Sequence, residues 1–337
     1  MIGRMVYGRE NAAEFLREWL ADKTDIVLMT GSKSYEKCGA AAFLTPFLAS
    51  KHVLHLTTVG ENARKEDVDA KVNELRVFEL ASSNSKLLNS KLQTAYIAVG
   101  GGTVIDTTKL IRGITGDLPP FLAIPTTAGT GAEATRFAVY YDHGKKMSAD
   151  DERYLPTDVL LIPEFAASQS AYQRASTEFD AYAQAVESLW ARGATDASRA
   201  YARKALDLMA SGEQILGAYW AGRAIDISRT TAAHAFSYYM TATYGIPHGH
   251  AVYMMFPYIC RANAHPEFIK RVPELSTLDD FIAEKSLDRV TLIDALFAHV
   301  NPARLGNNPC PVTKEHFNSR QSAQFADNPN LPSIKSV

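Results

Sequence analysis

Cysteine is scarce in this chain of 337 residues, which contains three copies spaced far apart. They form no Cys-x-x-Cys pair, so the sequence predicts neither a disulfide framework nor a thiolate zinc site. A metal ion bound by this chain would therefore need nitrogen and oxygen ligands. The three residues are Cys38, Cys260 and Cys310.

The chain also lacks long apolar runs and an excess of charge of either sign. No segment approaches the roughly 18–20 apolar residues that a membrane-spanning helix requires, and the start MIGRMVYGRE has no apolar signal core. Lys and Arg number 35 against 37 Asp and Glu, a balance that does not indicate a surface for nucleic acids. We expect a cytoplasmic enzyme that binds neither membranes nor nucleic acids.

Two hydrophobic patterns divide the chain. Up to residue 165, short β-rich runs alternate with polar helical segments, a pattern typical of a parallel α/β sheet. Beyond it the pattern is helical, with Ala-rich segments at 177–210 and 213–241, and the polar tail from residue 317 should be loosely packed. The sequence therefore predicts a Rossmann-like dinucleotide-binding domain at 1–165 and an all-α domain at 166–337. The expected strands lie in DIVLMTG, AYIAVGGG, FLAIPTT and DVLLIPE.

Glycines and hydroxyl side chains follow two of these strands. In AYIAVGGGTVIDTTK three glycines come directly after a strand, and a helix begins behind them. Glycine lets the backbone approach a pyrophosphate closely, and a helix N-terminus offers N–H donors. The alternative is a tight turn without a ligand, but AIPTTAGTGAEAT repeats the arrangement after the next strand. The expected dinucleotide contacts here are Gly100, Gly101, Gly102, Thr103, Asp106, Thr126, Thr127 and Thr130.

Asp180 and Gln184 stand four residues apart in STEFDAYAQAVESLW. On a helix both side chains project from one face, so two oxygen ligands would point together. Thr177 with Asp180 also fits the Ser/Thr-x-x-Asp/Glu capping pattern, in which case Asp180 helps to cap a helix at Thr177 and Gln184 is solvated. These residues alone leave both interpretations open.

A second polar stripe crosses segment 213–241, where four polar residues follow one another at intervals of four. One continuous helix would place them on one face. The structural alternative is an ion pair of Asp226 with Arg223 or Arg229, and a core position for His234. The stripe consists of Asp226, Thr230, His234 and Tyr238.

The order of these motifs resembles a known family. GGG-x-x-x-D, then PTTAGTGAE, then a helix with Asp180, then His234 followed by Pro-His-Gly around His248, is similar to the iron-containing (group III) metal-dependent alcohol dehydrogenases over almost the whole chain. The resemblance implies one divalent metal ion, Fe²⁺ or Zn²⁺, and it implies a homodimer.

The resemblance places three metal ligands at Asp180, His234 and His248. The fourth ligand position holds Gln184, where the general pattern has His, and a glutamine can coordinate through its carbonyl oxygen. Tyr238 stands where many members carry another His.

Three runs narrow the resemblance to a subgroup. QAVESLWARGATDASRAYA, AGRAIDISRTTAAHAFSY and YGIPHGHAV are similar to the phosphonoacetaldehyde reductases of phosphonate biosynthesis, which make 2-hydroxyethylphosphonate. A cluster of Arg and hydroxyl side chains near His234 would bind the phosphonate. Such a cluster recognises an oxyanion and not its carbon skeleton, so phosphonopyruvate or another small anionic aldehyde or keto acid remains an alternative. The expected substrate contacts are Arg229, Ser228, Thr230, Thr231 and Lys146.

The chemistry that the resemblance implies is reduction of an aldehyde by NADPH or NADH. The metal would polarise the carbonyl group, and His250 or Tyr238 would relay a proton to the product. The strand DIVLMTG ends at Gly31, with Ser32 next, and members that prefer NAD tend to carry an acidic residue at this position. We therefore expect NADPH to be accepted or preferred.

Other classes remain open. General group III alcohol dehydrogenases act on uncharged alcohols, and dehydroquinate-synthase-like lyases share the two-domain architecture but use NAD without net turnover. A non-catalytic binding protein is the third alternative. Stoichiometric consumption of NADPH with an aldehyde would exclude both the lyase and the binding protein.

Overall fold

The computed structural model describes residues 2–58, 60, 62–83, 94–116, 118–143 and 145–318, except for the side chains at 79–83, 145 and 146. The chain divides into two compact units, Met1–Gln169 and Ser170–Val337. The division falls slightly after the expected one, because the short helix α6 (Pro163–Ala166) belongs to the first unit. Most of the expected polar tail, from residue 319 on, and the Lys146 side chain lie outside the described residues.

The first unit is built on a six-stranded parallel sheet with the strand order β1-β8-β5-β4-β2-β3. All four strands expected from the sequence are present in it. A separate antiparallel hairpin joins β6 (Phe137–Asp142) to β7 (Lys145–Asp150). The sheet strands are β1 (Arg4–Tyr7), β2 (Asp25–Gly31), β3 (His52–Thr58), β4 (Thr94–Gly100), β5 (Phe121–Pro125) and β8 (Asp158–Leu161).

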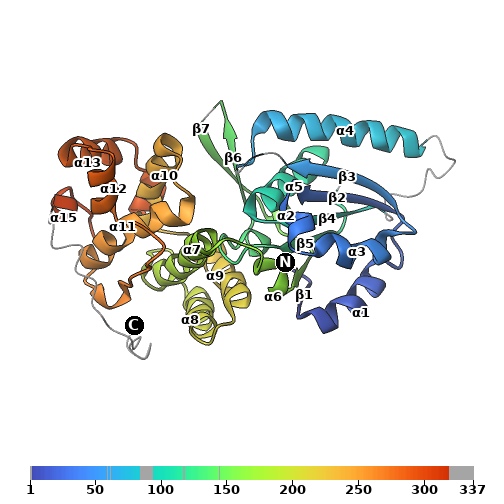
Figure 1. The fold of residues 1–337 in the computed structure, drawn as a ribbon, viewed down its shortest axis with the longest axis horizontal. Coiled ribbons are helices and arrows are strands. Elements are labelled where there is room, and N and C mark those ends of the chain that lie inside the picture. The colour runs from blue at the N-terminus through green and yellow to red at the C-terminus, as the bar shows by residue number, and fades with distance from the viewer. Residues whose placement is uncertain are drawn as a thin grey trace. The chain divides into compact units, whose positions relative to one another are not determined.

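Helices cover both faces of this sheet, as Figure 1 shows for α4 on one side and α1 and α3 on the other. Side chains alternate along each strand, so Ile26 and Leu28 pack with α1 and α3, while Val27 and Met29 pack with α4 and α5. Burial on both faces explains why these strands read as continuous apolar runs. The helices are α1 (Arg9–Leu20), α2 (Ser34–Lys37), α3 (Ala40–Leu48), α4 (Lys65–Ser83) and α5 (Gly102–Thr115), with short 3₁₀ turns η1 (Ala132–Ala134) and η2 (Glu152–Tyr154).

The direction of the strand order reverses between β2 and β4. The chain passes from β2 outward to β3 and then returns to the other side of β2 as β4. Thr30 pairs with Val99, and Gly100 pairs with Pro125, so the carboxyl ends of β2, β4 and β5 lie at one edge. Nucleotides bind at such a reversal in open α/β sheets.

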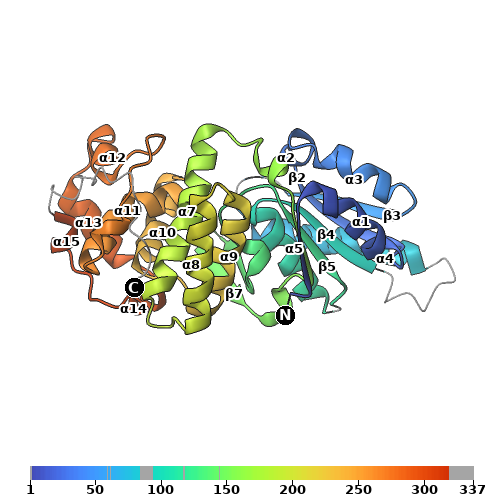
Figure 2. The ribbon, with the colours of Figure 1, turned by 90° about the horizontal axis from the view of Figure 1, so that it is seen from below.

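The second unit is helical, and Figure 2 shows α7, α8 and α9 side by side. Its core is a single apolar cluster in which aromatic rings of α7 and α11 meet, such as Phe179 with Tyr253 and Phe256. The helices are α7 (Ala171–Trp190), α8 (Asp196–Ala210), α9 (Gln214–Ser228), α10 (Ala232–Tyr244), α11 (His248–Ala262), α12 (Leu278–Glu284), α13 (Arg289–Ala298), α14 (Pro302–Gly306) and α15 (Glu315–Asn318), with the 3₁₀ turn η3 (Pro266–Phe268).

Each of the Ala-rich segments at 177–210 and 213–241 is divided between two helices. A capping box at Thr195 begins α8 and separates it from α7. Helix α9 ends at Ser228, because Arg229 adopts a left-handed φ of 63°, and α10 begins only at Ala232. The polar stripe expected on one helix is therefore divided between two helices and the turn that joins them.

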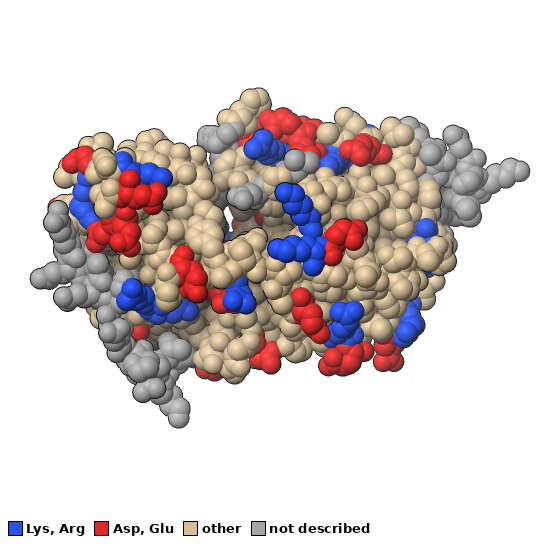
Figure 3. Space-filling model, viewed as in Figure 1, with Lys and Arg blue, Asp and Glu red and all other residues tan. Residues whose placement is uncertain are grey.

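Within the described residues, no helix is both long and apolar enough to cross a bilayer. On the face seen in Figure 3, basic and acidic side chains are interspersed over each unit. This distribution agrees with the nearly balanced composition of 35 basic and 37 acidic residues.

Candidate metal and cofactor sites

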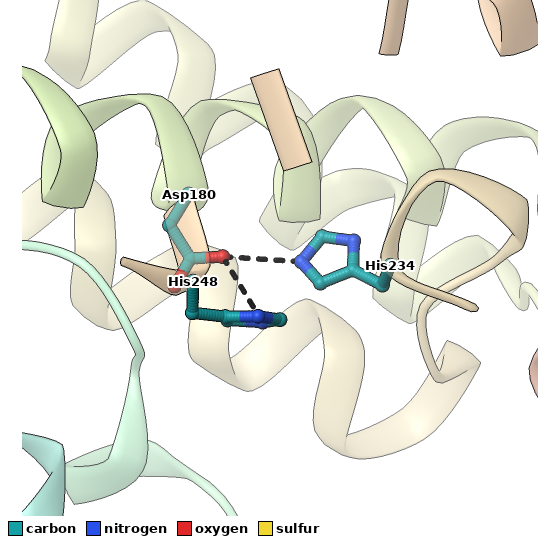
Figure 4. A group of neighbouring side chains, drawn as sticks. All are labelled: Asp180, His234 and His248. Carbon is teal, nitrogen blue, oxygen red and sulfur yellow. Dashed lines mark hydrogen bonds and ion pairs between the residues drawn. The ribbon is translucent and has the colours of Figure 1, made fainter. Parts of the chain in front are cut away.

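Three of the expected metal ligands converge in the second unit. Asp180 comes from α7, His234 from α10 and His248 from the start of α11, and Figure 4 shows both rings directed at the Asp180 carboxylate. Oδ1 of Asp180 lies 3.1 Å from Nε2 of His234 and 4.0 Å from Nε2 of His248. One ligand atom from each residue lies within 4.8 Å of the other two. Ligands at about 2.1 Å from a tetrahedral ion lie roughly 3.4 Å apart, so the set fits a divalent cation after a small contraction.

The two imidazole rings are oriented as metal ligands require. Nδ1 of His234 lies 2.6 Å from the Glu187 carboxylate, and Nδ1 of His248 lies 3.4 Å from the Ser237 hydroxyl oxygen. Because these partners accept the Nδ1 protons, each ring can present the lone pair of Nε2 to an ion. Nitrogen and carboxylate ligands of this kind suit Fe²⁺ or Zn²⁺.

Glu187 is the site residue that the sequence analysis missed. It is fully buried on α7, and its carboxylate accepts the backbone N–H groups of Thr231 and Ala233, each at 2.8 Å, besides the proton of His234. A signal was available, since Glu187 follows Asp180 by two helical turns and is the only charged residue in the run AYAQAVESLW.

The electrostatics of this cluster favour a cation. Burial raises the pKa of Asp180 and of Glu187, but the histidines and hydrogen bonds beside them outweigh burial and hold both pKa values below the usual range. Burial lowers the pKa of His234, whereas the Glu187 and Asp180 carboxylates raise it, with a net pKa of about 9. Two carboxylates thus flank the buried His234 ring, with Glu187 at Nδ1 and Asp180 at Nε2, and a metal ion bound at Nε2 would replace the proton there.

A glycine allows the helices that carry the ligands to meet. A Cβ atom at Gly249 would overlap the carbonyl oxygen of Ser176 and would lie 3.0 Å from the Cβ atom of Asp180. The start of α11 therefore approaches α7 more closely than any side chain at position 249 permits. This approach places His248 beside Asp180.

Gln184 belongs to the same cluster. It is buried, with 3% of its surface exposed, and it hydrogen-bonds to the Asp180 carboxylate. The alternative of a cap formed by Thr177 with Asp180, and of a solvated Gln184, is wrong, because α7 begins at Ala171 with Ser170 as its cap. Thr177 lies inside the helix and donates to the carbonyl oxygen of Arg174 at 3.1 Å.

The two expected proton donors differ in their surroundings. The ring of Tyr238 stacks on that of His248, with 5.7 Å between centroids, and its hydroxyl accepts a hydrogen bond from Arg304. Nδ1 of His250 lies 2.8 Å from the Tyr172 hydroxyl, and its Nε2 lies 2.9 Å from the carbonyl oxygen of Ser276. Of these two side chains, Tyr238 contacts a candidate metal ligand in the part of the chain that the structure describes. His250 connects the start of α7 to the segment before α12.

The expected substrate cluster surrounds the turn between α9 and α10. Nη1 of Arg229 donates to the carbonyl oxygen of Asp226 at 2.8 Å. The buried hydroxyl of Ser228 lies 2.9 Å from that of Ser188, and the buried hydroxyl of Thr231 accepts the Trp190 indole N–H at 3.2 Å. Thr230 is buried as well, and the Lys146 side chain is outside the described residues.

The expected cofactor loops meet at the sheet edge where the strand order reverses. A Cβ atom at Gly101 would lie 3.3 Å from Thr127, and one at Gly102 would lie 2.8 Å from the Thr130 hydroxyl. The two loops are thus in contact, and α5 begins directly behind Gly101. Thr103 is in its first turn, Thr126 is buried after β5, and Gly31 ends β2 at the same edge with Ser32 next in the chain.

Asp106 has a role inside the first unit. Its carboxylate accepts the backbone N–H of Val139 at 3.0 Å and lies 3.3 Å from Nζ of the buried Lys109. These contacts attach strand β6 to α5. The sequence predicts that Asp106 contacts the dinucleotide. In the structure its carboxylate contacts Val139 and Lys109 of the protein itself.

Two family models match the chain. The model for iron-containing alcohol dehydrogenase matches residues 3–163, and the model for the C-terminal part of the Fe-containing alcohol dehydrogenase family matches residues 174–304. The two matches follow the two compact units closely.

Individual relatives agree with these models. The phosphonoacetaldehyde reductase of Streptomyces viridochromogenes is 33% identical over 195 residues, which are 46% of this chain and 49% of that protein. The NAD-dependent methanol dehydrogenase of Bacillus methanolicus is 30% identical over 216 residues, 54% of this chain and 57% of that protein. The chain thus spans about half the length of these curated relatives. The solved sulfoacetaldehyde reductase of Bifidobacterium kashiwanohense in complex with NAD⁺ has the same fold, with a TM-score of 0.73, 23% identity and coverage of 94% of this chain and 95% of that chain.

Proposed function

We propose, since the chain belongs to the iron-containing alcohol dehydrogenase family, that it is a metal-dependent oxidoreductase that reduces a small anionic aldehyde with a nicotinamide cofactor. The substrate we propose is phosphonoacetaldehyde, and the product is 2-hydroxyethylphosphonate. The observation that carries the proposal is the convergence of the buried Asp180 and His234 and the half-buried His248 on one position. The phosphonoacetaldehyde reductase relative, at 33% identity, supports the substrate.

The residues of the second unit would have distinct roles. Asp180, Gln184, His234 and His248 would hold the divalent ion, which when bound supplies a Lewis acid for the carbonyl oxygen. Glu187 and Ser237 would keep the two rings oriented by accepting their Nδ1 protons. Tyr238 would donate the proton to the product oxygen, since its ring contacts His248 and its hydroxyl is held by Arg304.

The first unit would bind the dinucleotide, which when bound supplies the hydride. The glycines at 100–102 would let the pyrophosphate approach the N-terminus of α5, and the Thr126, Thr127 and Thr130 hydroxyls would contact the phosphates and ribose. No carboxylate stands at the end of β2, since Gly31 ends the strand and Ser32 follows it, so we propose that NADPH is accepted.

The cofactor proposal is tested by a carboxylate after β2. A Cβ atom at Gly31 would lie 2.5 Å from the Ser34 hydroxyl, so Gly31→Asp is made together with Ser34→Ala, and Ser34→Ala alone is the control. The double variant should raise the KM for NADPH much more than the KM for NADH, because a carboxylate repels the 2′-phosphate. Equal increases for both cofactors would contradict the assignment of this loop.

The function is tested with a substrate panel on metal-loaded protein. NADPH and NADH absorbance are followed with phosphonoacetaldehyde, phosphonopyruvate, propanal and a simple sugar, and phosphorus NMR identifies the product. Phosphonoacetaldehyde should give the highest kcat/KM and yield 2-hydroxyethylphosphonate. Faster reduction of phosphonopyruvate would favour the keto-acid alternative, and faster reduction of propanal a general alcohol dehydrogenase. Absence of net cofactor oxidation with every substrate would reject the reductase.

A further inference from the structure

Arg229, the arginine that the sequence suggests for phosphonate binding, has a structural role in the fold. Its left-handed φ of 63° ends helix α9, and Nη1 of its side chain donates to the carbonyl oxygen of Asp226 at 2.8 Å. A guanidinium that bonds to a carbonyl oxygen at a helix C-terminus stabilises the end of that helix. The end of α9 therefore accounts for Arg229 without a ligand.

A different arginine contacts the aromatic neighbour of a candidate metal ligand. Arg304, on α14, donates a hydrogen bond to the hydroxyl of Tyr238. The ring of Tyr238 stacks on the imidazole of His248, with centroids 5.7 Å apart and an interplanar angle of 27°. A single aromatic side chain thus connects the guanidinium to a candidate metal ligand.

The backbone around Arg304 is fixed by two asparagines. Oδ1 of Asn301 caps α14 and accepts the backbone N–H of Arg304 at 3.0 Å. Nδ2 of Asn307 donates to the carbonyl oxygens of Ser228 and Thr230, at 2.9 and 3.1 Å. These bonds attach α14 to the turn from which α10 begins. Arg304 is therefore presented from a short helix that is held against the site.

The chemistry of the substrate requires a cation close to the metal ligands. One methylene separates the carbonyl carbon of phosphonoacetaldehyde from phosphorus, so the group that binds the phosphonate must lie near the group that binds the carbonyl oxygen. A phosphonate is negatively charged, and an arginine guanidinium near the metal ligands offers the opposite charge. Arginine also matches the oxygens of a phosphonate with a planar fork of N–H donors.

We propose that Arg304 binds the anionic group of the substrate, with Tyr238 holding its guanidinium in position. The inference rests on the proposed function, because it names the residue that recognises the anion of that substrate. Arg229 has a structural role at the end of α9, and Arg304 selects the substrate.

Three variants distinguish the roles of Arg304 and Arg229. Arg304→Ala should lower the ratio of kcat/KM for phosphonoacetaldehyde to that for propanal by about tenfold to a hundredfold, because it removes a charge-assisted contact that only the anionic substrate makes. Most of the change should appear in KM for phosphonoacetaldehyde. Arg304→Lys should keep part of the ratio, since lysine retains the charge without the fork. Arg229→Ala should keep a ratio within about threefold of the parent.

Binding of ethylphosphonate gives a readout that does not depend on turnover. This probe carries the anion without a carbonyl group, and its affinity for the metal-loaded protein is measured by titration calorimetry. Arg304→Ala should weaken its binding about tenfold or more, and Arg229→Ala should not. Circular dichroism and the melting temperature of each variant exclude loss of fold as the cause, with Arg304→Lys as the more conservative comparison.

The outcomes distinguish this inference from the proposed function. Suppose that the parent reduces phosphonoacetaldehyde, and that Arg304→Ala changes neither the ratio of kcat/KM values nor the affinity for ethylphosphonate. This result overturns the role of Arg304 and leaves the proposed function standing. Loss of the ratio in Arg229→Ala alone overturns it too. A parent that reduces propanal but not phosphonoacetaldehyde rejects the proposed substrate, whereas binding of ethylphosphonate that depends on Arg304 would still support the anion site.

Discussion

Nδ1 of His234 lies 2.6 Å from Oε2 of Glu187, and both side chains are buried. The same carboxylate accepts two backbone N–H groups at the start of α10, which has no side-chain cap of its own. One residue of α7 therefore orients a candidate metal ligand and also completes the first turn of the helix that carries it. Loss of this carboxylate should affect the metal site and the fold together.

Substitutions at Glu187 test this double role. Glu187→Ala leaves a buried imidazole and two backbone donors unsatisfied, so the free energy of unfolding of the metal-free protein should fall by about 3 kcal/mol or more. Glu187→Gln retains the shape but lacks the charge, and metal affinity should fall about tenfold to a hundredfold. Urea unfolding and competition with a chelator measure the two effects. Asp196→Asn, on the exposed face of α8, is the control. Wild-type metal affinity in Glu187→Gln would contradict the assigned orientation of His234.

The candidate ligands themselves are tested by metal content. Asp180→Ala and His248→Ala should each lose the bound metal and the activity together, because each removes one of the four proposed ligands. Gln184→His should retain or tighten metal binding, since imidazole is a stronger ligand than an amide oxygen. Elemental analysis after purification without chelators measures the content. Full metal and full rate in Gln184→Ala would show that Gln184 is not a ligand.

The close approach of α7 and α11 is tested at Gly249. A methyl group in Gly249→Ala would overlap the carbonyl oxygen of Ser176, so the two helices must separate and His248 must move away from Asp180. We expect a loss of stability of about 1–3 kcal/mol and a much weaker metal site. Gly306→Ala is the matched control, because no atom lies within 4 Å of its added Cβ and its φ is not positive. Equal metal affinity in both variants would refute the importance of this contact.

A buried carboxyl group in the first unit predicts a pH dependence of stability. Burial raises the pKa of Glu133 from 4.5 to about 7, although Lys109 lowers it in part. Because the pKa is higher in the folded state, the stabilising contribution of Glu133 is complete below about pH 4.5 and is lost as the pH rises through 7. The shift corresponds to about 3 kcal/mol at most.

Glu133→Gln removes this titration. Relative to the variant, the parent should therefore lose up to about 3 kcal/mol of unfolding free energy between pH 4.5 and pH 8. Urea unfolding of both proteins at several pH values measures the difference between their free energies of unfolding. The contributions of other titrating groups cancel in this difference. Glu152→Gln, an exposed position with 83% of its side chain accessible, should show no such difference from the parent. A parent and a Glu133→Gln variant with parallel pH profiles would contradict the raised pKa.

The sequence by itself determined much of this protein. Alternation of apolar strands with polar helices predicted the parallel sheet, because strands covered by helices on both faces must be apolar throughout. Glycines after two strands predicted where the loops approach each other, and the spacing of Asp180 and Gln184 predicted one face of one helix. The resemblance then placed His234 and His248 with Asp180. Each of these conclusions depends on residues that are neighbours along the chain or on a motif of fixed spacing.

Only the tertiary structure decided which side chains meet across helices. Glu187 completes the start of α10 from forty-four residues earlier in the chain, and Arg304 reaches Tyr238 from α14. Periodicity carried no information about either pairing, because it describes one element and not the packing of two. The sequence did not predict the left-handed φ of Arg229 either, because a helical pattern runs through 213–241. Only the packed turn shows that α9 ends there. At this break Arg229 donates to the carbonyl oxygen of Asp226 in its own helix, and it is Arg304, from α14, that contacts Tyr238.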